Sequence, residues 1–263
     1  MRCFVVVVCG LILGLGCTLA QAADSGVPGV QPAVQPLTTS TPTAKPIEDQ
    51  GRMGSAVKVS ILGVGAEVAA RLTHRSNVRA GFNVMGYSRS FDKDGATYDG
   101  HLSMRTIEAH YDFYPWAHSF RVSPGLLTFL GNPVTANAFL SQGQSFTLGS
   151  TVYTSDPANP AHVNGRLNFN QVAPMITVGF GNLVHRDSKR FTVPFEVGVA
   201  FQGSPKTTLN LTGNVCDSQG LNCQSASSSS VQKDVIAEQN KLNNDIKAFK
   251  VYPIISVGFG YKF

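Results

Sequence analysis

The chain ends on the stretch VYPIISVGFGYKF, from Val251 to Phe263, in which apolar residues occupy every second position. The odd positions carry Val251, Pro253, Ile255, Val257, Phe259, Tyr261 and Phe263. The positions between them are mostly small or polar, as at Ser256, Gly258 and Gly260. Because successive side chains of a β-strand point to opposite faces, the stretch predicts a strand with one apolar and one wetter face. A soluble β-sandwich could carry the same alternation, but a C-terminal aromatic strand is typical of a barrel with an apolar outside.

The same period of two recurs along the rest of the chain from about residue 56. Six further strands are predicted at 57–72, 78–84, 107–113, 120–126, 172–184 and 191–201. Short connections near 73–77, 115–118 and 186–189 alternate with long ones near 90–99, 132–168 and 204–247, as in outer-membrane barrels. Such barrels have an even number of strands, so we predict eight. The missing strand lies within 40–56, or residues 57–91 divide differently.

The expected fold is therefore all-β, a closed antiparallel transmembrane β-barrel of eight strands over residues 55–263. Closure pairs every backbone group, as lipid requires. The last long connection also carries a helical pattern over 231–249, where Val235, Leu242 and Phe249 recur at intervals of seven with Ile246 between them. This helix either caps one mouth of the barrel or binds a partner.

The first 22 residues read as a cleaved secretory signal. Arg2 is followed by an apolar run from Phe4 to Leu15, and Ala20-Gln21-Ala22 offers small residues for cleavage. The run is short for a membrane-spanning helix. Residues 23–54, rich in Pro and Thr, are predicted to form a flexible spacer. Export and the barrel pattern together predict the outer membrane as the location and its lipids as partners.

Composition and cysteine content narrow the possible functions. The formal net charge of +5 is scattered, with no basic stripe, which disfavours nucleic-acid binding. After signal cleavage only Cys216 and Cys223 remain, and in an oxidising compartment we expect them to form a disulfide. A metal site would need further ligands near them, so no metal and no cofactor are expected.

Charged residues on the inward phase of the strands are the candidate site. They are Glu67, Arg71, Arg79, Glu108, His110, Asp112, Arg121 and Glu196. The interior of a small barrel is just wide enough for side chains to fill it, and buried charges there must be paired. Acids and bases occur in similar numbers, which predicts a plugged, salt-bridged lumen. The alternative is a narrow pore whose charges set ion preference.

Catalysis has weaker support. His110 shares a face with Glu108 and Asp112, and His185 precedes Asp187 and Ser188. Either set could contribute to a nucleophile–histidine–acid arrangement of a lipid-modifying barrel enzyme. Neither shows a nucleophile at an ordered strand position, so no catalytic residue is assigned and the protein is not expected to be an enzyme.

Four stretches make the chain resemble the small bacterial outer-membrane β-barrel proteins. They are LGVGAEVAARLTHRSNVRAGFNVMGYS, HYDFYPWAHSFRVSPGL, FEVGVAFQGSPKTTLNL and KAFKVYPIISVGFGYKF, within 62–131 and 191–263. The resemblance implies a small barrel similar to the membrane domain of outer membrane protein A. It also implies that the barrel-assembly machinery recognises the terminal strand through Val257, Phe259, Tyr261 and Phe263. It names no extracellular ligand.

The sequence thus leaves three functions. The expected one is a structural or surface-interaction barrel with a plugged lumen. The alternatives are a passive channel for small solutes or ions and a lipid-modifying enzyme.

Overall fold

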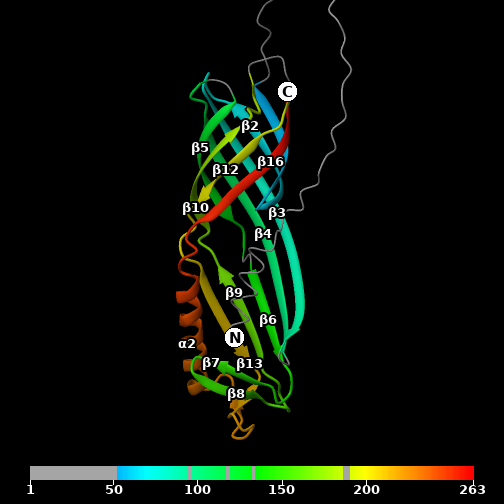
Figure 1. The fold of residues 1–263 in the computed structure, drawn as a ribbon, viewed down its shortest axis with the longest axis vertical. Helices are drawn as coiled ribbons and strands as arrows, with labels where there is room; N and C mark the ends of the chain where they lie inside the picture. Colours follow the sequence, from blue (N-terminus) through cyan, green and yellow to red (C-terminus); the bar gives the residue numbers. More distant parts are fainter. Residues whose placement is uncertain (1–51, 94–95, 117–118, 132–133, 186–189) are drawn as a thin grey trace, which may run out of the picture.

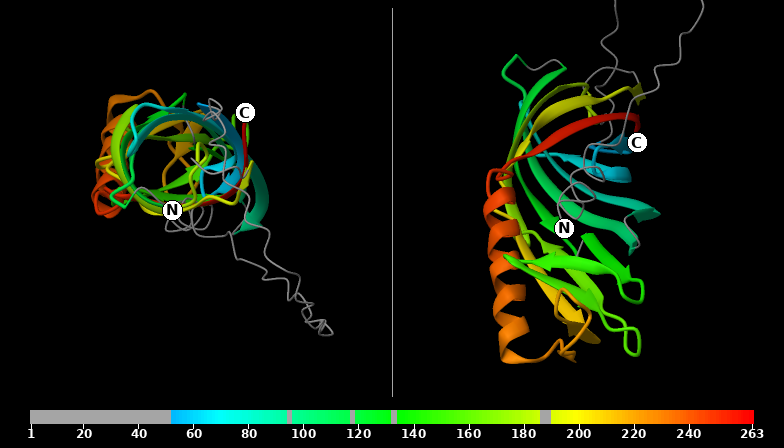
Figure 2. Two further views of the ribbon diagram at one scale, coloured as in Figure 1. Left: turned by 90° about the horizontal axis from the view of Figure 1, so that it is seen from above. Right: turned by 60° about the horizontal axis from the view of Figure 1, so that its bottom comes forward.

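Eight strands close into an antiparallel barrel in the computed structural model, which describes residues 52–93, 96–116, 119–131, 134–185 and 190–263. Each strand pairs with the next, and the last pairs with the first (Figure 1). The view along the barrel shows the closed ring (Figure 2). In ring order the strands are β1 (Met53–Ser60), β2 (Gly63–Arg71), β3 (Ser76–Lys93), β4 (Ala96–Phe113), β5 (Phe120–Phe129), β10 (Val172–Phe180), β12 (Phe195–Ala200) and β16 (Tyr252–Lys262).

The strand missing from the sequence prediction is β1, because the segment predicted as one strand over 57–72 is two strands. A turn at Ile61 and Leu62 separates β1 from β2, and Gly63 follows it with a φ of 108° that favours glycine. The Ser60 hydroxyl donates to the Gly63 carbonyl oxygen over 3.2 Å and accepts from the Leu62 amide over 3.1 Å. The first barrel strand starts at Met53, two residues before the predicted boundary at 55.

The predicted signal at 1–22 lies outside the described residues, as does the predicted spacer up to residue 51.

The barrel continues on one side into an extension away from the C-terminus (Figure 1). Strands β3 and β4 stay paired as far as Lys93 and Ala96, so the long connection predicted at 90–99 is wrong. Beside the far half of β4 lie β6 (Val134–Leu140), β9 (His162–Asn168) and β13 (Lys206–Thr212), in that order. The segments predicted as long connections therefore form a folded sheet.

A second sheet and a helix complete the extension. The sheet contains β7 (Ser145–Leu148), β8 (Thr151–Ser155), β14 (Asn214–Cys216) and β15 (Gln224–Ser225). Helix α2 (Ser229–Ile246) packs beside β13 and β7 and buries Val231, Val235, Leu242 and Ile246. It lies along the side of the extension rather than across a barrel mouth (Figure 1).

Helix α2 ends before Phe249 and accepts one hydrogen bond from Tyr153. Phe249, predicted on the buried face of the helix, lies beyond its end and is 46% exposed. Between β8 and the helix, the Tyr153 hydroxyl donates a hydrogen bond to the Asp234 carboxylate over 2.8 Å. Burial and this hydrogen bond raise the pKa of Tyr153 to about 12.

Among the residues that the structure describes, no helix has the length and apolar character that a membrane crossing needs.

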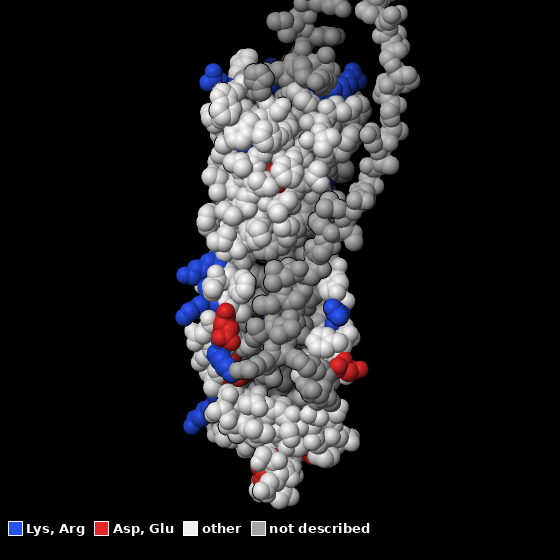
Figure 3. All heavy atoms as spheres, in the orientation of Figure 1, with Lys and Arg blue, Asp and Glu red and all other residues white. Residues whose placement is uncertain are grey.

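The outside of the barrel is apolar on every strand. Exposed residues include Val57, Val64, Phe82, Ile107, Leu126, Ile176, Phe195 and Val257. On β16, Phe259 is 54% exposed, whereas Ser256 on the opposite phase is buried, as the alternation predicts. In the space-filling view the barrel wall is a band almost without charged side chains, and charged residues gather at its two edges (Figure 3).

Candidate functional site in the barrel lumen

Charged side chains from six of the eight barrel strands meet inside the lumen. The members of this charge cluster are Lys58 (β1), Glu67 (β2), Arg79 (β3), Glu108 and Asp112 (β4), Arg121 (β5) and Glu196 (β12). Each is at most 5% exposed. They gather because each occupies an inward position of its strand and the ring closes to bring distant strands face to face.

Arg79 is the centre of the cluster. Its Nη1 lies 2.8 Å from Glu67 Oε2, and its Nε lies 3.1 Å from Asp112 Oδ2. Its Nη2 also forms an ion pair with Glu196 Oε2. Strands β3 and β12 are four places apart in a ring of eight, so the pair between Arg79 and Glu196 crosses the full width of the lumen.

Arg121 binds the same carboxylates from another side. Its Nη2 lies 2.8 Å from Glu196 Oε2, and its Nε lies 3.9 Å from Asp112 Oδ1. The Ser123 hydroxyl donates to Asp112 over 2.6 Å. Glu196 and Asp112 are thus each shared between two guanidinium groups, which leaves little freedom for either carboxylate to move.

Lys58 was missed by the sequence reasoning. Its Nζ lies 3.1 Å from Glu67 Oε2 and is ion-paired with Glu108. Reading 57–72 as one strand placed Lys58 on the outward phase with Leu62 and Val64. The signal was a change of phase: outward residues are odd-numbered through Val59 and even-numbered from Val64 onward.

The cluster is almost balanced in formal charge. Three cations, Lys58, Arg79 and Arg121, face four carboxylates, those of Glu67, Glu108, Asp112 and Glu196, which leaves a difference of one negative charge. Removing such ions from water is unfavourable by several kcal/mol each, and only close pairing offsets this. The shared contacts provide that pairing.

His110 lies in the lumen but is not bound into the cluster. It is 4% exposed, and neither ring nitrogen has a hydrogen-bond partner among the described residues. Its Nε2 lies 3.8 Å from Glu108 Oε2. A nucleophile–histidine–acid arrangement needs a hydroxyl bound to the imidazole, but Ser123 donates to Asp112 instead. Asp187 and Ser188 lie outside the described residues.

Arg71 does not join the cluster, contrary to the sequence prediction. It stands at the end of β2, is only partly buried, and donates from Nη2 to the His185 carbonyl oxygen over 3.2 Å. An inward-pointing position at a strand end does not bring a side chain into the charge cluster, because the side chain there lies at the rim of the barrel.

The rim near the C-terminus is covered by the segment that follows β10. This strand ends at Phe180 rather than at 184, because Gly181 adopts a φ of 98° and turns the chain. Leu183 and Val184 are then buried against Ala56 and Ala69. The Asn77 side chain donates to Asn182 over 2.9 Å. The segment 181–185 thereby covers this mouth.

On the far side of the charge cluster the lumen becomes apolar. Its lining includes Leu62, Leu102, Met104, Leu127, Met175 and Ile254. Phe129 of β5 and Tyr252 of β16 stand with ring centroids 6.4 Å apart, and Phe169 stacks on Phe129 at 5.5 Å. This apolar layer is continuous with the core of the extension.

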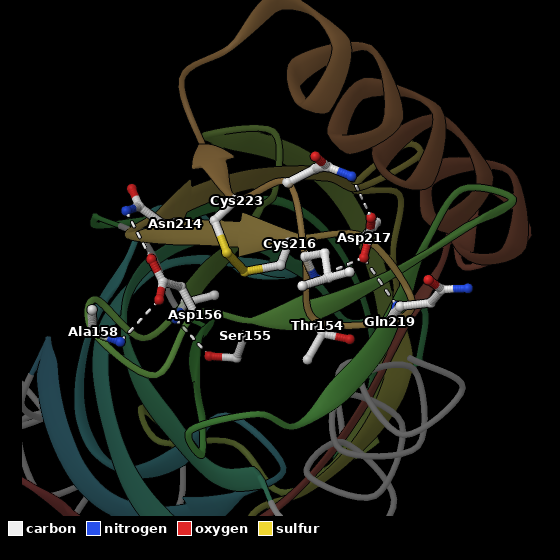
Figure 4. Close-up of a disulfide and its surroundings, with 12 residues drawn as sticks. Thr154, Ser155, Asp156, Ala158, Asn214, Cys216, Asp217, Gln219 and Cys223 are labelled. Atoms are coloured by element: carbon white, nitrogen blue, oxygen red, sulfur yellow. Dashed lines mark hydrogen bonds between the residues drawn. A yellow bond between two sulfur atoms is a disulfide. The ribbon is translucent and has the colours of Figure 1, made fainter.

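Cys216 and Cys223 form a disulfide at the tip of the extension (Figure 4). Asp156 lies within 4.8 Å of both sulfur atoms, but its carboxylate accepts hydrogen bonds from the Ala158 amide and the Asn214 side chain. The Ala158 amide keeps the pKa of Asp156 below its usual value. With both sulfurs bonded to each other, the three residues do not offer a set of metal ligands.

No protein-family model matches the chain, and no curated protein sequence matches it. The solved structures that are similar to it include two from Acinetobacter baumannii. The crystal structure of Acinetobacter baumannii CarO is 21% identical, with a TM-score of 0.49, over 82% of this chain and 100% of that chain. Acinetobacter baumannii CarO2 is 22% identical, with a TM-score of 0.49, over 80% of this chain and 98% of that chain. Similarity at this level does not identify a ligand or an activity for this chain.

Proposed function

We propose that the protein is an integral outer-membrane barrel whose lumen is plugged and whose extension displays a folded surface outside the cell. The apolar band around the barrel supports the membrane location, since a closed barrel leaves no unpaired strand edge in lipid. The C-terminus lies at the end opposite the extension, which would place it in the periplasm (Figure 1).

The ion pair between Arg79 and Glu196 is the observation that carries the plugged lumen. It joins strands on opposite sides of the ring, which supports a lumen filled by side chains at that level. The segment 181–185 on one side and the layer of Phe129 and Tyr252 on the other add two further barriers. A conducting pore would need all three to open.

The outer face of the extension supports a surface-interaction role. Its strands carry small polar residues outward: Thr135, Asn137, Asn164, Asn168, Thr208 and Asn210. The buried face carries Val134, Ala136, Val163 and Leu209 instead. Phe139 on the same face is 44% exposed, and a face rich in amides and hydroxyls with one exposed ring can hydrogen-bond to a sugar or peptide.

The terminal strand supports a partner for assembly. Val257 and Phe259 point outward on β16, Phe263 follows the strand and is exposed, and the Phe263 amide donates to the Met53 carbonyl oxygen over 3.0 Å. We propose that the barrel-assembly machinery binds this aromatic edge before β16 pairs with β1.

Planar-bilayer conductance tests the plugged lumen. Purified full-length protein, shown to be folded by a heat-dependent shift in gel mobility, is expected to produce no discrete current steps. A porin preparation in the same bilayers serves as the positive control. Reproducible steps from the folded protein would overturn the plug and favour the passive channel. A change in lipid A mass on expression would instead support a lipid-modifying enzyme.

A further inference from the structure

We propose that three exposed lysines at the edge of the apolar band bind the phosphate groups of an anionic lipid. These residues, Lys206, Lys247 and Lys250, are called the lysine cluster below. The proposal rests on the membrane location proposed above and adds a ligand class to it. Lys206 is the first residue of β13, which follows the barrel strand β12, and Lys247 and Lys250 lie between α2 and the barrel strand β16, so the cluster stands where the barrel meets the extension.

Hydrogen bonds hold the two segments of the lysine cluster side by side. The Gly203 amide donates to the Lys250 carbonyl oxygen over 3.1 Å, and the Ser204 hydroxyl donates to the Lys247 carbonyl oxygen over 3.2 Å. The Gln202 side chain donates to the Phe249 carbonyl oxygen over 3.2 Å. The backbone that presents the three ammonium groups is therefore fixed, although the side chains themselves are exposed.

The lysine cluster carries charge that the described residues do not neutralise. None of its three side chains forms an ion pair with a described residue. Asp245 in the last turn of α2 is also exposed, so three positive charges and one negative charge share this surface, a net of two positive. Figure 3 shows basic side chains projecting just where the uncharged band of the barrel ends.

Exposed apolar residues lie next to the lysine cluster in the chain. Phe201 is 50% exposed, Phe249 is 46% exposed and Val251 is 45% exposed. A surface with ammonium groups at the edge of an apolar wall matches a lipid that has phosphates on its headgroup and acyl chains beneath. A free phosphate would use the lysines only and leave the apolar residues uncovered.

A role in helix stability explains only part of the arrangement. Lys247 is the C-cap of α2, where a cation interacts favourably with the helix dipole. Lys206 begins β13 and Lys250 lies between α2 and β16, so neither charge stabilises the helix dipole as a C-cap residue would. The coincidence of all three with the band edge is what the lipid explains.

Lipid selection in nanodiscs tests the proposal. Full-length protein is placed in phosphatidylcholine nanodiscs with a small fraction of lipid A, and the lipid A retained after delipidation is counted by mass spectrometry. Each lysine near an anionic surface changes binding by about fivefold. The variant K206Q/K247Q/K250Q is therefore expected to lose on the order of 100-fold in retention. The variant K233Q/K241Q/R89Q removes three exposed charges elsewhere on the extension, with Arg89 on β3, four strands away from β13, and is expected to retain lipid A as the wild type does.

Two further arms distinguish the sources of phosphate. Dephosphorylated lipid A is expected to be retained poorly by the wild type, and millimolar inorganic phosphate is expected not to displace intact lipid A. Equal retention by the wild type and the lysine-cluster variant would overturn the proposal, as would displacement by inorganic phosphate. Failure of the protein to enter nanodiscs in a heat-modifiable form would instead count against the membrane location itself.

Discussion

Replacing Arg79 by alanine tests whether the charge cluster stabilises the barrel. The side chain joins Glu67, Asp112 and Glu196 in a space from which water is almost excluded. Removing one partner of a buried ion pair destabilises a protein by about 3–5 kcal/mol, because the remaining charge is left uncompensated. After the substitution Glu67 keeps Lys58, and Asp112 and Glu196 keep Arg121. We therefore expect a loss of about 3 kcal/mol, near the lower end of that range.

Urea unfolding of the barrel in detergent micelles measures this loss. The single tryptophan, Trp116, lies in the connection between β4 and β5 and reports unfolding by fluorescence. The matched control is Arg166→Ala on the exposed face of β9, which we expect to change stability by about 0.5 kcal/mol or less. If Arg79→Ala does not fold, Arg79→Lys keeps the charge, loses the shared contacts and should show a smaller decrease.

A double-mutant cycle with Glu196→Ala isolates the pair that crosses the lumen. Residues in one ion-pair network show coupling of about 0.5–3 kcal/mol, and we expect a value in the upper half of that range. Two results would refute the reasoning: a loss below about 1 kcal/mol for Arg79→Ala, or strict additivity with Glu196→Ala.

Three further predictions concern assembly, packing and the tip of the extension. Phe263→Asp should lower the amount of heat-modifiable barrel in the outer membrane with little loss of stability, since a charge at the interface costs at most about 1 kcal/mol there; unchanged yield would contradict the assembly role. Gly179→Ala should destabilise the barrel by about 1–3 kcal/mol in the same urea assay, because the added Cβ would lie 2.4 Å from the Phe195 carbonyl oxygen, whereas Gly86→Ala meets no atom within 4 Å and should be neutral. Replacing Cys216 and Cys223 by serine should destabilise the tip by about 2.4 kcal/mol, the loop-closure term for a sequence separation of 7. We expect faster proteolysis after β14 and an unchanged unfolding transition of the barrel. A changed barrel transition would show that the tip does not unfold independently.

The barrel was predictable because its signal is local. Alternation along β16, β5 and β10 reports which face of each strand points out of the barrel, and this needs no knowledge of the neighbouring strand. The prediction failed where the phase changed within an apolar run, at Ile61 and Leu62, so that β1 was merged with β2. It also placed the end of β10 too late, because Gly181 turns the chain while the apolar pattern continues.

The extension was harder to predict for a physical reason. Strands β6, β9 and β13 are amphipathic, but they are short and far apart in the chain: β7 and β8 separate β6 from β9, and the barrel strands β10 and β12 separate β9 from β13. Their stability comes from pairing with the far half of β4, a contact between segments distant in the chain. Helix α2 was found because its apolar residues recur with a helical period.

The sequence by itself determined that the chain forms an apolar-walled barrel with ionisable groups on the inward phase, because the period of two is a property of each strand alone. Only the tertiary structure decided which of those groups meet. Arg79 contacts Glu196 because ring closure places β3 opposite β12, and Lys58 joins them because a two-residue turn reverses the chain after β1. Such contacts depend on strand order and register, which are long-range properties that no single segment of the sequence encodes.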